Sequence, residues 1–317
     1  MQGGIPQGSA LGPLLFLVYM NSLPSQVTEG LLLQYADDTS DYTTLIYSGS
    51  TPDIVATTVS MQLSHIQSWI DRSRMKLNFT KSCVMWFSVN ASRLPTYPPI
   101  TVDNSVLRVV TEQKYLGLVF DSQLSWSSHV SGVCKKMSYY LHLLNSHRYV
   151  LNNSIMKLLL DSLVLSHIYY ALPVWGPSLN VQLLSRLKRM QNRAVRLAFS
   201  LKKYDHVSDY YKRLHWLPLD QFIKFRSVCS MYKQFHQRRC ILLEPPIQFG
   251  QSHSHYTRTS SSFARIVRYN LNFSQRFFRY RATQWWNSLP SQFANLPFNV
   301  FVDAVQSHFD HCDALGT

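Results

Sequence analysis

The stretch that decides the fold of this chain runs from Leu31 to Tyr47 and reads LLLQYADDTSDYTTLIY. An apolar, β-prone run leads into a short acidic segment, and a second run rich in Thr, Ile and Tyr leads out. This pattern predicts a β-hairpin, with Asp37 and Asp38 at or just before its turn. Because neighbouring strand residues point to opposite faces, the two carboxylates can approach one site only where the backbone turns.

Two carboxylates at a rigid hairpin tip could begin a site for Mg²⁺. This ion prefers oxygen ligands and usually keeps water and substrate phosphates in its remaining positions. A plainer interpretation is open for this stretch alone, because Asp is common in turns, where its side chain bonds the local backbone. The rest of the chain has to decide between a solvated turn and a metal site.

Charge is distributed unevenly over the 317 residues. Residues 1–71 contain six acidic residues and no Lys or Arg, whereas residues 72–317 contain 31 basic and 11 acidic residues. An acidic segment with paired Asp, followed by a strongly basic remainder, favours a metal site beside a surface that binds a polyanion. A basic protein without a nucleic-acid partner is the alternative. The 46% content of hydrophobic residues argues against wholesale disorder.

The five cysteines form no CxxC pair, and their odd number and wide spacing predict reduced thiols in an intracellular protein, with no zinc site. The apolar run Leu14–Met20 is too short to span a bilayer. No basic segment precedes it, so neither a signal peptide nor a transmembrane segment is expected. We expect a location in the nucleus or cytoplasm and no membrane partner.

Further elements follow from Pro and Gly positions and from periodicity. Residues 3–12 predict a Gly-rich loop, after which Pro13 starts a short buried helix over 14–20. Residues 52–77 predict an amphipathic helix whose polar face carries Gln62, and 82–89 a strand. A second hairpin is expected from Leu107–Val110 and Tyr115–Phe120, turning around Glu112-Gln113. Helical periods then cover roughly 128–147, 153–173 and 180–199.

The third of these helices is basic on one side. Residues 186–240 contain 14 basic and three acidic residues, interleaved with Tyr210, Tyr211, His215 and Trp216. Basic residues with aromatics suit phosphate contact and base stacking. For any single residue, a solvated helix face is an equally good explanation. The candidate nucleic-acid contacts on this helix are Arg186, Lys188, Arg189, Arg193 and Arg196.

Taken together, these stretches resemble the reverse transcriptase of Jockey-like non-LTR retrotransposons. GIPQGSALGPLLF (4–16) is similar to the family's loop and helix that grip template and nucleotide, and YADD (35–38) to its catalytic hairpin. LNFTK (77–81) resembles the turn whose lysine faces the incoming triphosphate. YLGL (115–118), with LSW (124–126) and His129, resembles the primer-grip hairpin leading into the thumb. QNRA (191–194), LHWLP (214–218) and WNSLP (286–290) resemble the region after the thumb.

The resemblance implies template-directed phosphoryl transfer from a dNTP to a primer 3′ hydroxyl, with an RNA template, a DNA primer or RNA–DNA hybrid, and two Mg²⁺ ions. Asp37 and Asp38 would hold metal, and Lys81 would offset the charge of the leaving pyrophosphate. Lys81 has a plainer explanation as an exposed turn lysine. The remaining implied contacts are Gln7, Gly8, Ser9 and Tyr35 for nucleotide and template, and Tyr115, Leu116 and Gly117 for the primer grip.

One departure from the family pattern matters. The family's site uses a third carboxylate, an Asp on a strand well before the Pro-Gln-Gly-Ser loop, whereas the one acidic residue before Asp37 here is Glu29. We therefore expect an N-terminally truncated enzyme that lacks this Asp and the fingers and is inactive alone. A non-catalytic nucleic-acid-binding remnant is the alternative. Asp41 is a weak substitute for the third ligand.

The expected fold class is α+β. A partial reverse-transcriptase palm of antiparallel hairpins and helices would occupy residues 1–122. An all-α thumb would follow over 123–200, then a basic, mostly helical C-terminal region over 201–317 with a linker near 246–262. The template specificity and the oligomeric state do not follow from the sequence.

Overall fold

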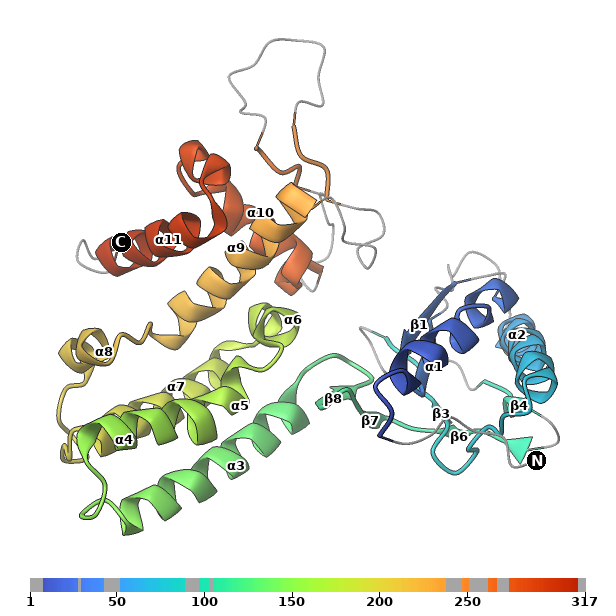
Figure 1. Ribbon diagram of the computed structural model, residues 1–317, viewed down its shortest axis with the longest axis horizontal. Coiled ribbons are helices and arrows are strands. Elements are labelled where there is room, and N and C mark those ends of the chain that lie inside the picture. Colours follow the sequence, from blue (N-terminus) through green and yellow to red (C-terminus); the bar gives the residue numbers. More distant parts are fainter. Residues whose placement is uncertain are drawn as a thin grey trace. The chain divides into compact units, whose positions relative to one another are not determined.

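The computed structural model describes residues 8–27, 30–42, 52–88, 97–102, 105–237, 247–250, 262–266 and 274–312. The chain divides into two compact units, Met1–Gln113 and Lys114–Thr317, and each is considered by itself (Figure 1). Both helices and short strand pairs are present, which agrees with the expected α+β class at this coarse level.

The first unit combines two helices with short strand pairs. In chain order it contains α1 (Gly12–Met20), the 3₁₀ turn η1 (Leu23–Gln26), β1 (Leu31–Tyr35), β2 (Asp38–Tyr42), α2 (Pro52–Arg72), β3 (Cys83–Val84), β4 (Thr101–Val102), β5 (Ser105–Val106) and β6 (Arg108–Val109). β1 pairs antiparallel with β2, and β4 antiparallel with β5, whereas β3 and β6 run parallel.

Helix α2 organises the core of this unit. Ile66, Trp69 and Ile70 on one side of it are buried with Met20 and Leu23, and the indole Nε1 of Trp69 donates to Ser22 Oγ at 3.0 Å. The helix ends at Arg72, five residues before the predicted end at 77. Arg74 takes a left-handed φ of 53°, and the chain reverses there so that Met75 and Leu77 can pack against the same cluster.

Helix α1 corrects one prediction. It starts with Pro13 in its first turn, as expected, but it is not a buried helix: Leu14, Leu15, Leu17 and Val18 are each more than half exposed, and only Gly12 and Met20 are buried. An apolar sequence predicts burial, but it does not say whether another element packs on the helix. Among the described residues, this helix carries the densest group of exposed apolar side chains.

The strands after residue 82 also differ from expectation. The predicted strand over 82–89 is only β3, and it pairs with β6 rather than continuing as a long element. The predicted hairpin around Glu112-Gln113 is wrong. The strands that pair are β7 (Glu112–Tyr115) and β8 (Leu118–Asp121), and the turn is Leu116-Gly117, where Gly117 supplies a φ of 83°. Glycine adopts this conformation without strain, whereas Glu112 or Gln113 would be strained in it.

The second unit is helical after β8. Its elements are α3 (Ser127–Ser146), α4 (Asn153–Leu159), the π-helical η3 (Leu160–Leu165), α5 (Ser166–Tyr169), α6 (Leu172–Trp175), η4 (Gly176–Ser178), α7 (Val181–Ala198), α8 (Ser208–Leu214), α9 (Leu219–Gln237), η5 (Ser274–Arg276), α10 (Phe278–Asn287), η6 (Ser291–Asn295) and α11 (Phe298–Cys312). The three helical regions predicted between 128 and 199 are therefore confirmed.

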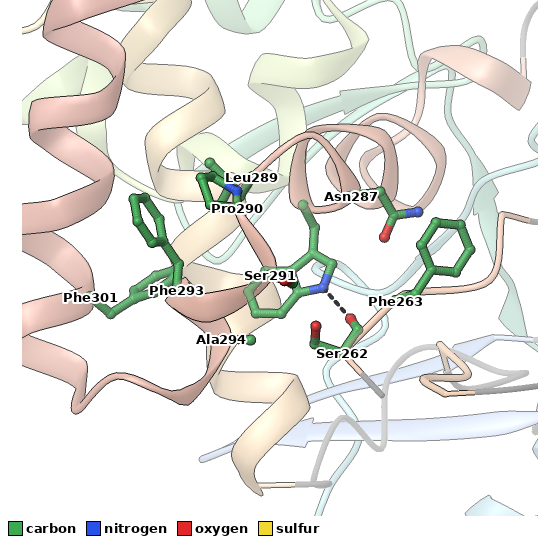
Figure 2. Close-up of a pocket in the computed structure, with 10 residues that line it drawn as sticks. Ser262, Phe263, Asn287, Leu289, Pro290, Ser291, Phe293, Ala294 and Phe301 are labelled. Atoms are coloured by element: carbon green, nitrogen blue, oxygen red, sulfur yellow. Dashed lines mark hydrogen bonds between the residues drawn. The ribbon is translucent and has the colours of Figure 1, made fainter. Parts of the chain in front are cut away.

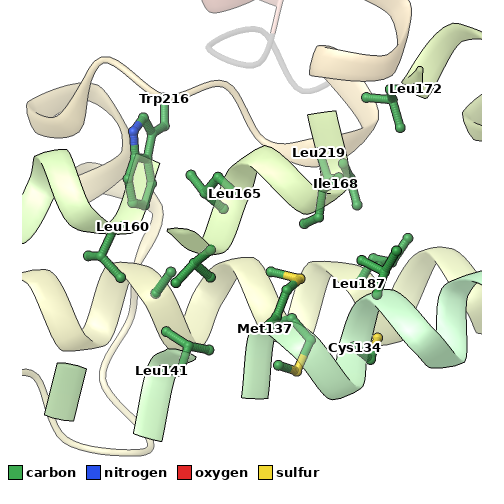
Figure 3. Packing of buried hydrophobic residues seen from close by; sticks show 14 of the residues in the cluster. Cys134, Met137, Leu141, Leu160, Leu165, Ile168, Leu172, Leu187, Trp216 and Leu219 are labelled. Carbon is green, nitrogen blue, oxygen red and sulfur yellow. The ribbon is translucent and has the colours of Figure 1, made fainter. Parts of the chain in front are cut away.

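Two apolar clusters hold the second unit together. The larger cluster joins α3, η3, α5 and α7, where Met137, Leu160, Leu165, Ile168 and Leu187 are fully enclosed (Figure 3). The smaller cluster joins α9, α10 and α11 around Met231, Trp286 and Phe301. Each fully buried aliphatic side chain contributes about 1.5–3 kcal/mol.

The run Asn153–Ser178 is the one helical stretch of the described chain with the length and composition to cross a membrane. Leu160, Val164 and Ile168 of this stretch are enclosed in the larger cluster, whereas Leu158 and Val174 are exposed. A core helix of a folded protein meets the same criterion, so this stretch is weak evidence for a membrane span.

The connection from β8 to α3 depends on one carboxylate. Asp121 accepts backbone N–H groups from Gln123 (3.1 Å), Ser125 (2.9 Å) and Trp126 (2.8 Å), and the hydroxyl of Ser125 at 3.2 Å. These bonds fold a turn in which Leu124 and Trp126 both have left-handed φ angles, and they direct the chain into α3. A carboxylate that satisfies free N–H groups before a helix is a strong local constraint.

Replacing Asp121 by Ala removes the acceptor for these three N–H groups. We expect the free energy of unfolding of the helical unit to fall by about 2 kcal/mol, measured by urea denaturation followed by circular dichroism. Asp121→Asn keeps one acceptor oxygen and should lose about half as much. Equal stability of wild type and Asp121→Ala would show that the turn is held by packing of Trp126 instead.

Candidate functional site

The predicted hairpin is present, and its turn is as short as a hairpin allows. β1 and β2 pair in register from Leu31–Tyr42 to Tyr35–Asp38, which leaves only Ala36 and Asp37 in the turn. Ala36 has a φ of 54°, a conformation that non-glycine residues adopt rarely. Asp37 in the turn and Asp38 at the start of β2 are both exposed, and among the described residues neither carboxylate has a hydrogen-bond or ion-pair partner.

The two faces of the hairpin have different environments. Directly paired residues share a face, so Tyr35 and Asp38 lie on one side while Leu32 and Asp41 lie on the other. Leu32 packs against the cluster of α2, whereas Tyr35 is 66% exposed. The face that carries Asp38 is therefore the open one.

Asp41 belongs to the closed face. Its Oδ2 accepts a hydrogen bond of 2.7 Å from Gln62 Nε2 on α2. Burial raises the pKa of the Asp41 carboxyl, and the bond from Gln62 offsets this only in part. Gln62, predicted on the polar face of its helix, is instead 4% exposed. Asp41 thus points away from Asp38 and does not complete a cluster with the paired carboxylates.

Lys81 lies in a tight turn that follows α2. Asn78 closes the turn: its Oδ1 accepts the hydroxyl of Thr80 at 2.7 Å and the backbone N–H of Lys81 at 3.2 Å. Leu77 packs inward against the cluster of α2, and Phe79 packs against a smaller cluster of Ile100, Val102 and Leu107. The side chain of Lys81 is left exposed. The turn that Asn78 closes therefore presents the cation of Lys81 to solvent.

The Gly-rich segment before α1 is described from Gly8 onward, and Gln7 lies outside the described residues. Gly8 has a φ of 83° with open space around it. Ser9 Oγ accepts the backbone N–H of Leu11 at 3.2 Å, and Ser9 O accepts that of Gly12 at 3.2 Å. Ser9 therefore turns the chain into the helix.

In the second unit, the hairpin at Leu116-Gly117 is held by one tyrosine. The hydroxyl of Tyr170 donates to Leu116 O at 2.7 Å, and a Cβ added at Gly117 would lie 3.1 Å from the Tyr170 ring. Tyr170 can reach the turn because the helix breaks after it. Ala171 is left-handed, and Trp175 Nε1 donates to Tyr170 O at 3.0 Å. Tyr115 is half-buried beside this turn, whereas Leu116 and Gly117 are exposed.

The basic residues of α7 differ in how far the fold engages them, and Arg193 Nη1 donates weakly to Met190 Sδ at 3.7 Å. Arg186, Arg189 and Arg193 are exposed. Burial raises the pKa of the Cys134 thiol on α3, and Arg186 and Arg189 offset part of this effect, so both guanidinium groups lie near α3. Lys188 forms an ion pair of 2.9 Å with Asp220. The exposed cations therefore follow one edge of the α3–α7 pair.

Arg196 is the engaged arginine of this helix. Its Nη2 donates to the backbone oxygen of Asp205 at 3.1 Å, and its side chain is half-buried. This contact ties α7 to the loop that follows it, so Arg196 holds local structure at the end of the basic edge.

The aromatics singled out in this region are mostly structural. Tyr211 and Trp216 are each 7% exposed, and they donate to Asn192 Oδ1 at 2.6 Å and Asp161 Oδ1 at 2.7 Å. Gln191 Nε2 likewise donates to Leu217 O at 2.9 Å. The segments 191–194 and 214–218 are therefore packed against each other, and Tyr211 and Trp216 have no free ring face for base stacking. The exposed tyrosine of the region is Tyr204, which periodicity did not single out, and the imidazole of His215 is exposed as well.

The segment 286–290 also has a structural explanation. Trp286 donates to Ser262 O at 2.7 Å, the dashed line in Figure 2. Asn287 exchanges two hydrogen bonds with the backbone of Ala264. A cavity of about 70 Å³ lies beside these residues, lined mainly by apolar side chains such as Phe263, Phe293 and Phe301. No charged side chain lines it, so it offers no group for phosphoryl chemistry.

Metal-ligating groups are sparse. Nowhere in the described part of the chain do three or more His, Cys, Asp or Glu side chains form a cluster that could hold a metal ion. Asp37 and Asp38 supply oxygen ligands of the type that Mg²⁺ prefers, but as a pair. Cys83, Cys134 and Cys229 are free thiols.

Comparison with known proteins identifies the class. Residues 2–120 match the family model described as "Reverse transcriptase (RNA-dependent DNA polymerase)". The chain is 29% identical to the "Probable RNA-directed DNA polymerase from transposon BS" of Drosophila melanogaster, over 62% of this chain and 22% of that protein. No solved structure matches.

Two further relatives carry the name of one mobile element. The chain is 31% identical to the "RNA-directed DNA polymerase from mobile element jockey" of Drosophila melanogaster, over 41% of this chain and 14% of the relative. It is 27% identical to the protein of the same name from Drosophila funebris, over 62% of this chain and 22% of that protein. The chain thus aligns with about a fifth or less of the length of these relatives. Residues 2–120 thus match a reverse transcriptase domain, and these relatives are RNA-directed DNA polymerases of mobile elements such as jockey.

The buried carboxylate Asp41 leads to a pH-dependent prediction. A carboxyl whose pKa is raised by folding favours the folded state when protonated, so its contribution to stability falls as pH rises through the folded pKa. Asp41→Asn keeps an acceptor for Gln62 and removes the buried charge. We expect its thermal stability to exceed that of wild type by a margin that grows from pH 4 to pH 7.

Gln62→Ala provides the opposite arm of this test. It removes the donor that favours the ionised carboxylate, so its loss of stability should be larger at pH 7 than at pH 4. Parallel stability curves for all three proteins would mean that Asp41 is not buried against α2.

Proposed function

We propose that this chain is the part of an RNA-directed DNA polymerase that carries the catalytic hairpin and the helical region after it. The observation that supports this most directly is the β1–β2 tip, where two adjacent carboxylates stand exposed within the segment that matches the family. The activity of the whole relatives comes to this chain only as a proposal, because the chain corresponds to a minor part of them.

The roles follow from the chemistry of phosphoryl transfer. Asp37 and Asp38 would hold Mg²⁺, and a pair of such ions, roughly 3.5–4 Å apart, would stabilise the attacking and leaving oxygens. Lys81, on its braced turn, would offset charge on the leaving pyrophosphate. Gly8 and Ser9, together with Gln7, would support nucleotide and template, and Tyr35 on the open hairpin face would lie near the primer end.

Among the described residues, the proposed site contains two carboxylates and no third. A two-metal centre of this family needs a third acidic ligand, and within the described residues none joins Asp37 and Asp38. Asp41 lies on the closed face and bonds Gln62 instead. We therefore propose that the chain does not extend a primer by itself, and that a polypeptide segment carrying the missing carboxylate would have to complete the site.

The helical unit has a separate proposed task, which is to hold primer and template. The turn at Tyr115, Leu116 and Gly117 would act as the primer grip, kept in shape by Tyr170. The helices up to residue 200 would form the thumb, with Arg186, Arg189 and Arg193 on phosphates, and residues 201–317 would form the basic region after it. In this proposal Lys188 and Arg196 contribute less directly, because Asp220 and the Asp205 backbone already engage them.

Primer extension on an RNA template with Mg²⁺ tests the catalytic part of the proposal. The purified chain should bind primer–template and yet give no extension, both as wild type and as Asp38→Asn, because two carboxylates cannot hold two metal ions. Extension by wild type that disappears in Asp38→Asn would show that a third ligand exists in this chain. That result would overturn the proposed inactivity while supporting the role of Asp38.

A second candidate function is nucleic-acid binding without catalysis. It is favoured by the cationic edge of α7, which remains exposed and does not depend on the hairpin carboxylates. This function requires only that Arg186, Arg189 and Arg193 meet phosphates.

The salt dependence of binding tests this edge. Each lost phosphate contact should reduce the log–log slope of affinity against salt by about 0.9 on duplex and about 0.7 on single strands. The double variant Arg186→Ala, Arg189→Ala should therefore lower the slope by nearly twice the amount expected for one contact. Lys188→Ala, on the same helix but paired with Asp220, should change it much less. An affinity that is flat in salt for the wild type would rule out the polyanion surface altogether.

A further inference from the structure

The loop between α7 and α8 presents an aromatic ring to solvent. We call residues 200–206 the Tyr204 loop. The side chain of Tyr204 is 84% exposed, and the Nζ of the adjacent Lys203 lies 5.2 Å from its ring centroid. A single exposed aromatic side chain is common on protein surfaces, so the shape and the charge of the loop decide whether Tyr204 can act as a binding site.

The loop is held in shape by several hydrogen bonds. Ser200 is left-handed with a φ of 54°, and Leu201 N–H donates to Arg196 O at 2.9 Å, which ends α7. Asp205 Oδ2 accepts the N–H of Lys202 at 2.7 Å, and Arg196 Nη2 binds Asp205 O at 3.1 Å. Tyr204 thus stands on a closed turn, so less conformational entropy is lost when a ligand orders it.

The charge around the ring is positive. Lys202 and Lys203 precede Tyr204 and are exposed, and the carboxylate of Asp205 is turned toward the backbone N–H of Lys202. Residues 196–213 hold five basic and two acidic side chains. A ring beside two lysines suits a ligand that is both flat and anionic.

The other tyrosines of this segment have less free surface. Tyr210 packs on Phe199, with ring centroids 4.8 Å apart, and the guanidinium of Arg213 lies 5.3 Å from its ring. Tyr211 is buried. Tyr204 is therefore the tyrosine of this segment with a face open to an incoming base.

We propose that the Tyr204 loop is a contact site for single-stranded nucleic acid. A nucleobase stacks on the phenol ring of Tyr204, and Lys202 and Lys203 meet the flanking phosphates. Bases in a duplex have both faces covered by their neighbours, whereas an unpaired strand offers a free face, and stacking on aromatic side chains tolerates any sequence. This inference rests on the proposed nucleic-acid binding and adds to it a site and a strand class.

The test compares two substitutions of Tyr204 in the full chain. Binding is measured by fluorescence anisotropy with a labelled single-stranded RNA of about 12 nucleotides without self-complementarity, and with the matching duplex. Tyr204→Ala should weaken single-strand binding about five- to 150-fold, because the stacking surface is lost. Tyr204→Phe keeps the ring and should bind within about twofold of wild type, and duplex binding should be unchanged in both.

Tyr149 provides a matched control. It is also 84% exposed and carries a neighbouring cation, Arg148, 4.6 Å from its ring, but it lies beside exposed apolar Val150 rather than beside lysines. Tyr149→Ala should leave single-strand binding unchanged. Tyr204 makes no buried contact, so the melting temperature of Tyr204→Ala should equal that of wild type, which separates lost contact from lost folding.

Salt titration adds a second readout. Tyr204→Ala removes no charge and should keep the salt slope of single-strand binding, whereas Lys202→Ala with Lys203→Ala should reduce it by about 0.7 for each contact. If the wild type binds single-stranded RNA and Tyr204→Ala binds it with the same affinity, the stacking site is overturned. The proposed nucleic-acid binding would then still stand. A wild type that binds neither strand form would overturn both proposals.

Discussion

The register of the β1–β2 hairpin is the constraint on which the first unit depends. Side chains alternate between the two faces of a strand, so a shift by one residue would exchange the faces. Leu32 must pack on α2 and Asp41 must meet Gln62, and these two contacts hold the register. Once it is held, Asp38 has to lie on the open face and Asp37 in the turn. The exposure of the carboxylate pair is thus a consequence of burial on the other side.

In the second unit, too, side-chain hydrogen bonds stabilise the fold and leave other side chains exposed. Asp121 gathers three N–H groups before α3, and Asp161 accepts the indole of Trp216. A break after Tyr170 lets this side chain reach the turn at Leu116. The groups left over for a polyanion are those that the fold does not engage: the exposed arginines of α7 and the Tyr204 loop.

Local pattern was sufficient for much of the fold. The hairpin at 31–42 and the helices near 128–147, 153–173 and 180–199 were predictable because alternation and helical periodicity act over a few neighbouring residues. The second hairpin was displaced, because Gly117 decides the turn through its φ angle and apolar runs do not reveal it. The burial of α1 was overestimated, because composition cannot tell which helix has a neighbour.

By itself, the sequence determined the resemblance to reverse transcriptases, the paired carboxylates and the basic character of the later helices, since these depend on residue type and spacing. Tertiary structure alone decided which members of each group are free to act. Asp41 is turned inward to Gln62 although it lies three residues from Asp38, and Tyr211 and Trp216 are buried although they sit among basic residues. The physical reason is that burial and hydrogen bonding are satisfied between residues far apart in the chain, so the availability of a side chain is a property of its neighbours in space.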